Sequence, residues 1–95
     1  MAVPQDNYCE SLSRIRNDIR AKLELSELDM EQARQEWNNL TALRLGETDA
    51  NSRGILAGRQ FEARSRIDAL VRLVFQLRER LDQIENDKII HGCPV

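Results

Sequence analysis

Three side chains that could react or bind a metal lie near the two ends of the sequence. Cys9 is close to the beginning, and His91 and Cys93 are close to the end. If the chain folds back at its middle these ends meet, so a disulfide or a three-ligand metal site is geometrically possible. Structural zinc sites usually have four ligands in close pairs such as CxxC, a spacing that this sequence lacks. We therefore favour two free thiols, with a Cys9–Cys93 disulfide as the second interpretation and a metal site as the third, and predict no metal and no cofactor.

Motifs of common catalytic sites do not occur in the sequence. There is no glycine-rich phosphate loop, no His-Glu-x-x-His pair and no nucleophile elbow. His91 is the one histidine, and nothing in the pattern gives it a catalytic role. A thin pair of helices also offers no concave pocket of the size that a substrate needs. We predict that the protein is not an enzyme.

Arginine is concentrated in one segment of the chain. Residues 53–80 contain seven Arg against three acidic side chains, Glu62, Asp68 and Glu79. Guanidinium groups pair well with phosphate oxygens, so a small nucleic-acid-associated regulator is an alternative function. The arginines are spread around the expected helix, however, and the first half of the chain supplies acidic neighbours. Ion pairs on a solvated surface are the favoured interpretation, and nucleic acid is not the expected partner.

The elements that carry these residues are predicted to be two long helices. Apolar residues recur with helical spacing over residues 5–45, namely Tyr8, Leu12, Ile15, Ile19, Leu23, Met30, Ala33, Trp37 and Leu40. Polar Ser26 takes a core position of this pattern, and a break in the helix there is the less favoured outcome. The second helix is expected over residues 55–89, with a regular seam at Leu56, Gln60, Ala63, Ile67, Leu70, Val74, Leu77, Leu81 and Ile84.

Turn-forming residues cluster between the two helices. The segment 46–54, GETDANSRG, is the predicted hinge, with Gly46 suited to a left-handed helix end and Asp49 or Ser52 to the cap of the next helix. Two long helices and a short hinge predict one all-α domain over residues 1–95, an antiparallel two-helix hairpin of coiled-coil type.

A second row of residues on the later helix indicates a binding surface. Its members follow the same spacing of four and three, rotated away from the core seam: Ala57, Phe61, Arg64, Asp68, Val71, Phe75 and Arg78. A two-helix hairpin covers only one seam, so the apolar members are expected to face water. Exposed aromatic and Arg side chains are typical of contact surfaces. We predict partner-binding residues at Phe61, Arg64, Val71, Phe75, Arg78, Leu25 and Leu28.

The partner is predicted to be a second copy or another protein. Small helical proteins often complete their core as homodimeric four-helix bundles, so self-association is favoured. The predicted role is an adaptor, an assembly factor or a small chaperone, and an inhibitory subunit would use the same surface. The net charge of −2 gives no general attraction to nucleic acid or anionic lipid. No apolar run is long enough to span a membrane and residues 1–10 do not resemble a signal peptide, so a cytoplasmic location is expected.

Overall fold

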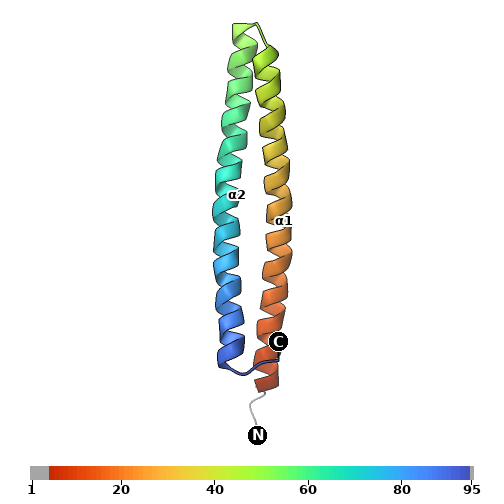
Figure 1. Ribbon diagram of the computed structural model, residues 1–95, viewed down its shortest axis with the longest axis vertical. Coiled ribbons are helices and arrows are strands. Elements are labelled where there is room, and N and C mark those ends of the chain that lie inside the picture. Colours follow the sequence, from red (N-terminus) through yellow and green to blue (C-terminus); the bar gives the residue numbers. More distant parts are fainter. Residues whose placement is uncertain (1–4, 95) are drawn as a thin grey trace. The chain divides into compact units, whose positions relative to one another are not determined.

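Two long α-helices joined by a short linker make up the computed structural model, which describes residues 5–94 (Figure 1). Helix α1 spans Gln5–Gly46 and helix α2 spans Ala50–Ile90, and no strand occurs among the described residues. The predicted all-α helical hairpin is confirmed. Its pairing into a four-helix bundle stays a prediction.

Side-chain caps in the linker decide where α2 begins. The Asp49 carboxylate accepts hydrogen bonds at 3.0 Å from both the backbone N–H and the hydroxyl of Ser52, so Asp49 caps the helix. The Glu47 carboxylate in turn accepts the backbone N–H groups of Thr48 and Asp49 at 3.1 and 3.0 Å. Side chains of the three-residue linker thus accept the backbone N–H groups around the start of α2, so the helix can begin at Ala50. The hinge predicted over 46–54 is therefore too long, and α2 starts five residues before position 55.

Helices α1 and α2 end in different ways. Gly46 was expected to close α1 in a left-handed conformation, but the one positive φ among the described residues is that of Gly92, at 67°. Beyond α2, the backbone N–H of Gly92 donates to Ile89 O at 3.1 Å and that of Cys93 donates to Lys88 O at 2.8 Å. This pair of bonds is the Schellman motif, which turns the chain back over the helix end.

The chain divides into two compact units, each made of one segment of α1 and one of α2. We call residues 26–73, which include the linker, the hinge unit, and residues 1–25 and 74–95 the terminal unit. Within each unit the α1 segment lies antiparallel beside the α2 segment (Figure 1). Each unit therefore has a single contact face between two helices.

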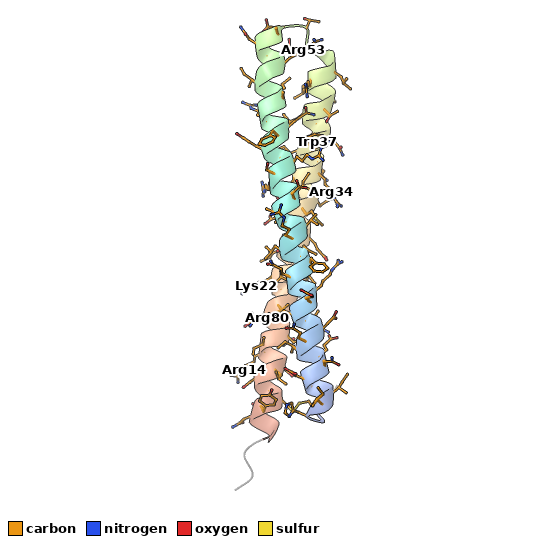
Figure 2. The ribbon with its side chains drawn as sticks, turned by 90° about the vertical axis from the view of Figure 1, so that its left-hand side faces the viewer. Arg14, Lys22, Arg34, Trp37, Arg53 and Arg80 are labelled. Atoms are coloured by element: carbon orange, nitrogen blue, oxygen red, sulfur yellow. A yellow bond between two sulfur atoms is a disulfide. The ribbon has the colours of Figure 1, made fainter. Side chains whose placement is uncertain are left out.

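In the hinge unit, the core follows the predicted seam. Its buried residues are Ser26, Ala33, Leu40, Gln60 and Ala63. Met30, Trp37, Ile67 and Leu70 are half-buried in the same pattern, and Trp37 is labelled in Figure 2. Helix α1 runs through Ser26 without a break, as favoured. Since only one face of each helix is covered, large side chains of the seam stay partly open to solvent.

Polar groups enter the seam of the terminal unit at two places. Its buried residues are Leu12, Ile19, Val74, Lys88 and Cys93. Lys88 extends the spacing of four and three one step beyond Ile84, where the predicted seam ended. On α1, Ile15 and Arg16 are both half-buried. Arg16 lies four residues after Leu12 and three before Ile19. A regular spacing of four and three residues therefore runs through Leu12, Arg16, Ile19 and Leu23, whereas the spacing through Ile15 is three, four and four.

Candidate protein-binding surface

A face of α2 outside the seam carries two of the exposed apolar residues of the hinge unit. Phe61 is 73% exposed and Val71 is 47% exposed, whereas Gln60, one position from Phe61, is 5% exposed. Ala57 is half-buried, and Arg64 and Asp68 are exposed. We call these five residues, Ala57, Phe61, Arg64, Asp68 and Val71, the outer ridge. Its members are four and three residues apart, so they share one side of the helix.

Charged members of the outer ridge have no partner within the described part of the chain. Neither Arg64 nor Asp68 takes part in a hydrogen bond or ion pair among residues 5–94. Leu28, on the α1 segment of the same unit, is also exposed. Within the outer ridge itself, apolar and charged side chains lie together on one side of α2, a combination that is typical of protein contacts.

The remaining predicted partner-binding residues belong to the terminal unit. Phe75 is 65% exposed, and Leu25 and Arg78 are also exposed. Arg78 has an interaction within the chain, so it is not a free charge. Both phenylalanines of the sequence are therefore mostly exposed, one in each unit.

A hydrogen-bonded network supports the hinge unit beneath this surface. The buried Gln60 amide donates to Thr41 Oγ1 at 2.7 Å and accepts a hydrogen bond from Arg44 Nη1 at 2.9 Å. The Thr41 hydroxyl donates to Trp37 O at 2.8 Å. Because a buried amide without partners is costly, this network favours one alignment of α1 against α2. It thereby holds the outer ridge at a defined place.

Among the arginines of segment 53–80, Arg53 has a structural partner. Its Nε donates to Glu47 O at 2.7 Å, beside the linker (Figure 2). The other six are exposed. An ion pair of the expected interhelical kind joins Arg20 Nη2 to Glu85 Oε1 at 3.2 Å in the terminal unit, with both side chains about half exposed. Such exposed pairs contribute little to stability.

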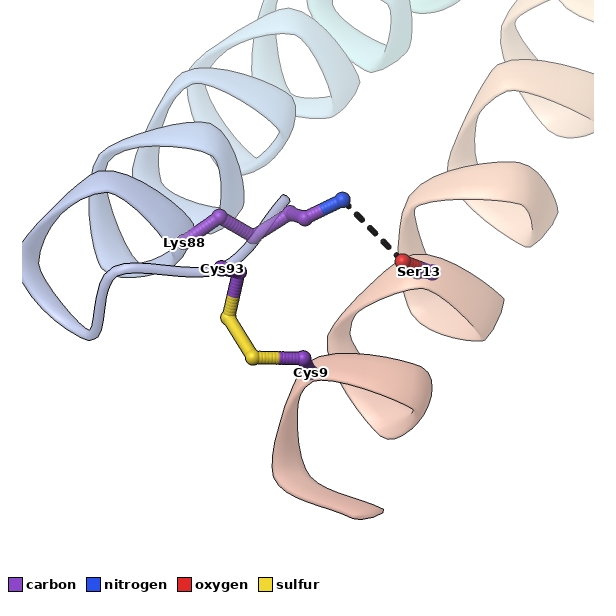
Figure 3. Close-up of a disulfide and its surroundings, with 4 residues drawn as sticks. All are labelled: Cys9, Ser13, Lys88 and Cys93. Atoms are coloured by element: carbon purple, nitrogen blue, oxygen red, sulfur yellow. Dashed lines mark hydrogen bonds between the residues drawn. A yellow bond between two sulfur atoms is a disulfide. The ribbon is translucent and has the colours of Figure 1, made fainter. Parts of the chain in front are cut away.

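A disulfide connects the two ends of the chain in the terminal unit. The Sγ atoms of Cys9 and Cys93 are bonded, in place of the two free thiols that the sequence favoured (Figure 3). The Schellman motif at Gly92 explains the contact, because it turns Cys93 back toward α1. Both sulfurs are used by this bond, and no group of three metal-binding side chains occurs among residues 5–94.

Two further contacts surround the disulfide. The buried Lys88 ammonium donates to Ser13 Oγ at 3.0 Å, next to the bonded sulfurs (Figure 3). The ring of Tyr8 lies edge to face with that of His91, with the ring centres 4.6 Å apart. The imidazole of His91 therefore takes part in packing at the chain ends.

A small recess beside the disulfide is lined by Arg16, whose side chain has a buried polar atom without a hydrogen-bond partner. Its volume is about 210 Å³, and its lining residues are Arg16, Arg20, Glu85, Lys88, Ile89 and Cys93. Arg16 Nε is buried without a hydrogen-bond partner in the described structure. Sequence reasoning missed this atom, although the strict heptad spacing of Leu12, Arg16 and Ile19 could have indicated it.

No protein-family model matches the chain, and the comparisons with curated proteins and with solved structures find no match either. Within residues 5–94, neither helix contains an apolar stretch long enough to cross a membrane.

Proposed function

We propose that this chain is a non-enzymatic protein–protein interaction module that binds through the outer ridge of α2. The observation that carries the proposal is the exposure of Phe61, at 73%, beside the two unpartnered charges Arg64 and Asp68. Large exposed aromatic side chains next to Arg are enriched at protein interfaces. An adaptor, an assembly factor or a small chaperone would use the surface in this way, and so would an inhibitory subunit.

Binding would follow from burial of the apolar ridge side chains. Complete burial of a phenylalanine or valine side chain contributes roughly 1.5–3 kcal/mol. Helix α1 covers the seam face of α2 and leaves Phe61 and Val71 exposed, so burial of these side chains requires a partner. Self-association is the favoured mode, because a second copy brings the same ridge and completes a bundle of four helices.

A direct test is to place charges on the exposed aromatic residues. Phe61→Asp together with Phe75→Asp should lower the solution mass of the protein, or abolish capture of a partner by the tagged chain, while helicity is unchanged. Ile55→Asp is the matched control, because Ile55 is an exposed apolar residue of α2 outside the outer ridge. If the double variant keeps both its mass and its set of captured proteins, the surface does not bind.

The disulfide bears on the compartment in which this function operates. Disulfides persist in oxidising compartments and are rare in a reducing cytoplasm. The Cys9–Cys93 bond therefore weighs against the cytoplasmic location expected from the sequence. Thiol alkylation of the protein as isolated from its own cells, followed by mass measurement, would determine which state exists there.

A nucleic-acid-associated role is the alternative, and it rests on the exposed arginines of α2. Such binding releases counterions and falls steeply as salt rises. A lack of retention on heparin at low ionic strength would remove this alternative.

A further inference from the structure

We propose that the partner of the outer ridge is a second copy of this chain, docked antiparallel so that Arg64 of each copy faces Asp68 of the other. This inference rests on the proposed function, since it names the occupant of the same surface. It concerns the hinge unit alone, in which all five residues of the outer ridge lie.

The order of residues along the outer ridge favours the antiparallel alignment of the two copies. In an antiparallel pair with two-fold symmetry, residues at equal distances on either side of the axis face each other. Arg64 and Asp68 are each two positions from Arg66, and Phe61 and Val71 are each five positions from it. An axis at the level of Arg66 therefore brings Arg64 to Asp68 and Phe61 to Val71, twice each. Both charged members of the ridge then meet an opposite charge, and Phe61 and Val71 meet an apolar side chain.

Other alignments do not have this complementarity. A parallel pair in register would place Arg64 against Arg64 and Asp68 against Asp68, and like charges at an interface repel. Moving the antiparallel axis to lie between residues 69 and 70 would place Asp68 against Val71, which leaves a carboxylate facing an apolar side chain. The alignment centred on Arg66 avoids both penalties.

The structure leaves the required groups accessible. Arg64 and Asp68 are exposed and form no ion pair or hydrogen bond within the described residues. Phe61 and Val71 are among the exposed apolar residues of the hinge unit. Gln60 and Ala63, on the neighbouring face of α2, are buried against α1, so the ridge lies outside the face that α1 covers and is open to a second copy.

Charge reversal tests the pairing without altering its apolar residues. In a homodimer, Arg64→Asp would place carboxylates against carboxylates twice, and Asp68→Arg would place guanidinium groups together twice. Each single variant should dimerise about tenfold more weakly than the unchanged chain, as measured by sedimentation or by light scattering over a concentration series. Helicity measured by circular dichroism serves to confirm that both variants fold.

Mixing the two variants gives the decisive result. A heterodimer of Arg64→Asp with Asp68→Arg restores both opposite-charge pairs, so the equimolar mixture should dimerise as the unchanged chain does. The doubly reversed variant, Arg64→Asp with Asp68→Arg in one chain, should also recover the homodimer. Arg59→Asp is the matched control, because it makes the same change at an exposed position of α2 outside the outer ridge, and it should leave the dimer unaffected.

Failure of this inference can be told apart from failure of the proposed function. A chain that stays monomeric at all concentrations, or a dimer that is weakened by Phe61→Asp but not rescued by mixing, would overturn the Arg64–Asp68 pairing. Capture of another protein that depends on Phe61 would still support the interaction module in either case. If Phe61→Asp changes neither the mass nor the captured proteins, the proposed function fails as well.

Discussion

Cys9 and Cys93 are separated by 84 positions in the sequence, and a disulfide brings their Cα atoms to 5.5 Å from each other. The bond closes a loop that contains nearly the whole chain. Closing a long loop removes conformational freedom from the unfolded state, which is the usual explanation for stabilisation by a disulfide. The link also joins the two helix segments of the terminal unit, at ends that would otherwise fray.

Loss of this disulfide should lower the free energy of unfolding. We expect Cys93→Ser to reduce it by about 2–4 kcal/mol, because the open chain has far more unfolded conformations. Urea unfolding with and without reductant measures the difference. A variant with serine at both positions 9 and 93 is the control, since reductant should not change it; equal stability of the oxidised and reduced parent chains would contradict the expectation.

Removal of the Thr41 hydroxyl should destabilise the hinge unit. Thr41→Val deprives the buried Gln60 amide of an acceptor, and a buried donor without a partner costs about 1–3 kcal/mol. Gln60→Leu should cost less, because it removes the buried amide as well as its hydrogen bonds. Denaturant midpoints of the two variants give the comparison. If Gln60→Leu is the more damaging change, packing at this position matters more than its hydrogen bonds.

An apolar residue in place of Arg16 should raise stability. The Nε of Arg16 is buried without a partner at a core position of the heptad, so Arg16→Leu removes a desolvation cost and adds apolar contact. We expect a gain of about 1 kcal/mol in the free energy of unfolding. Arg14→Leu is the matched control, because Arg14 is exposed and its replacement should change stability by less than about 0.5 kcal/mol.

The cap at Asp49 should be needed for the first turn of α2. Asp49→Ala removes the acceptor for both groups of Ser52, and the loss of an N-cap costs about 1 kcal/mol. Asp49→Ser should restore most of the stability, because a serine hydroxyl can also accept from the free amides of the helix. Hydrogen exchange of residues 50–53 reports on this turn; unchanged exchange in Asp49→Ala would show that Glu47 suffices to hold the linker.

Much of the fold could be predicted because it depends on repeated local spacing. Ala33, Leu40 and Ala63 were expected in the seam and are buried, and Phe61 and Phe75 were expected outside it and are exposed. These outcomes follow from a helix that advances by a constant angle per residue, so covering one face leaves the other faces open. The start of α2 was less predictable, since a single capping carboxylate decided it.

The sequence by itself determined two long helices, most residues of their shared seam and the exposed ridge, because periodic patterning acts along the chain and needs no knowledge of distant contacts. Only the tertiary structure decided that Cys9 meets Cys93, that Gln60 bonds with Thr41 and Arg44, and that the Nε of Arg16 is buried without a partner. Each of these depends on which side chain of one helix arrives opposite which side chain of the other. That register is set by all the packing and hydrogen bonds of the seam together, so no local pattern contains it.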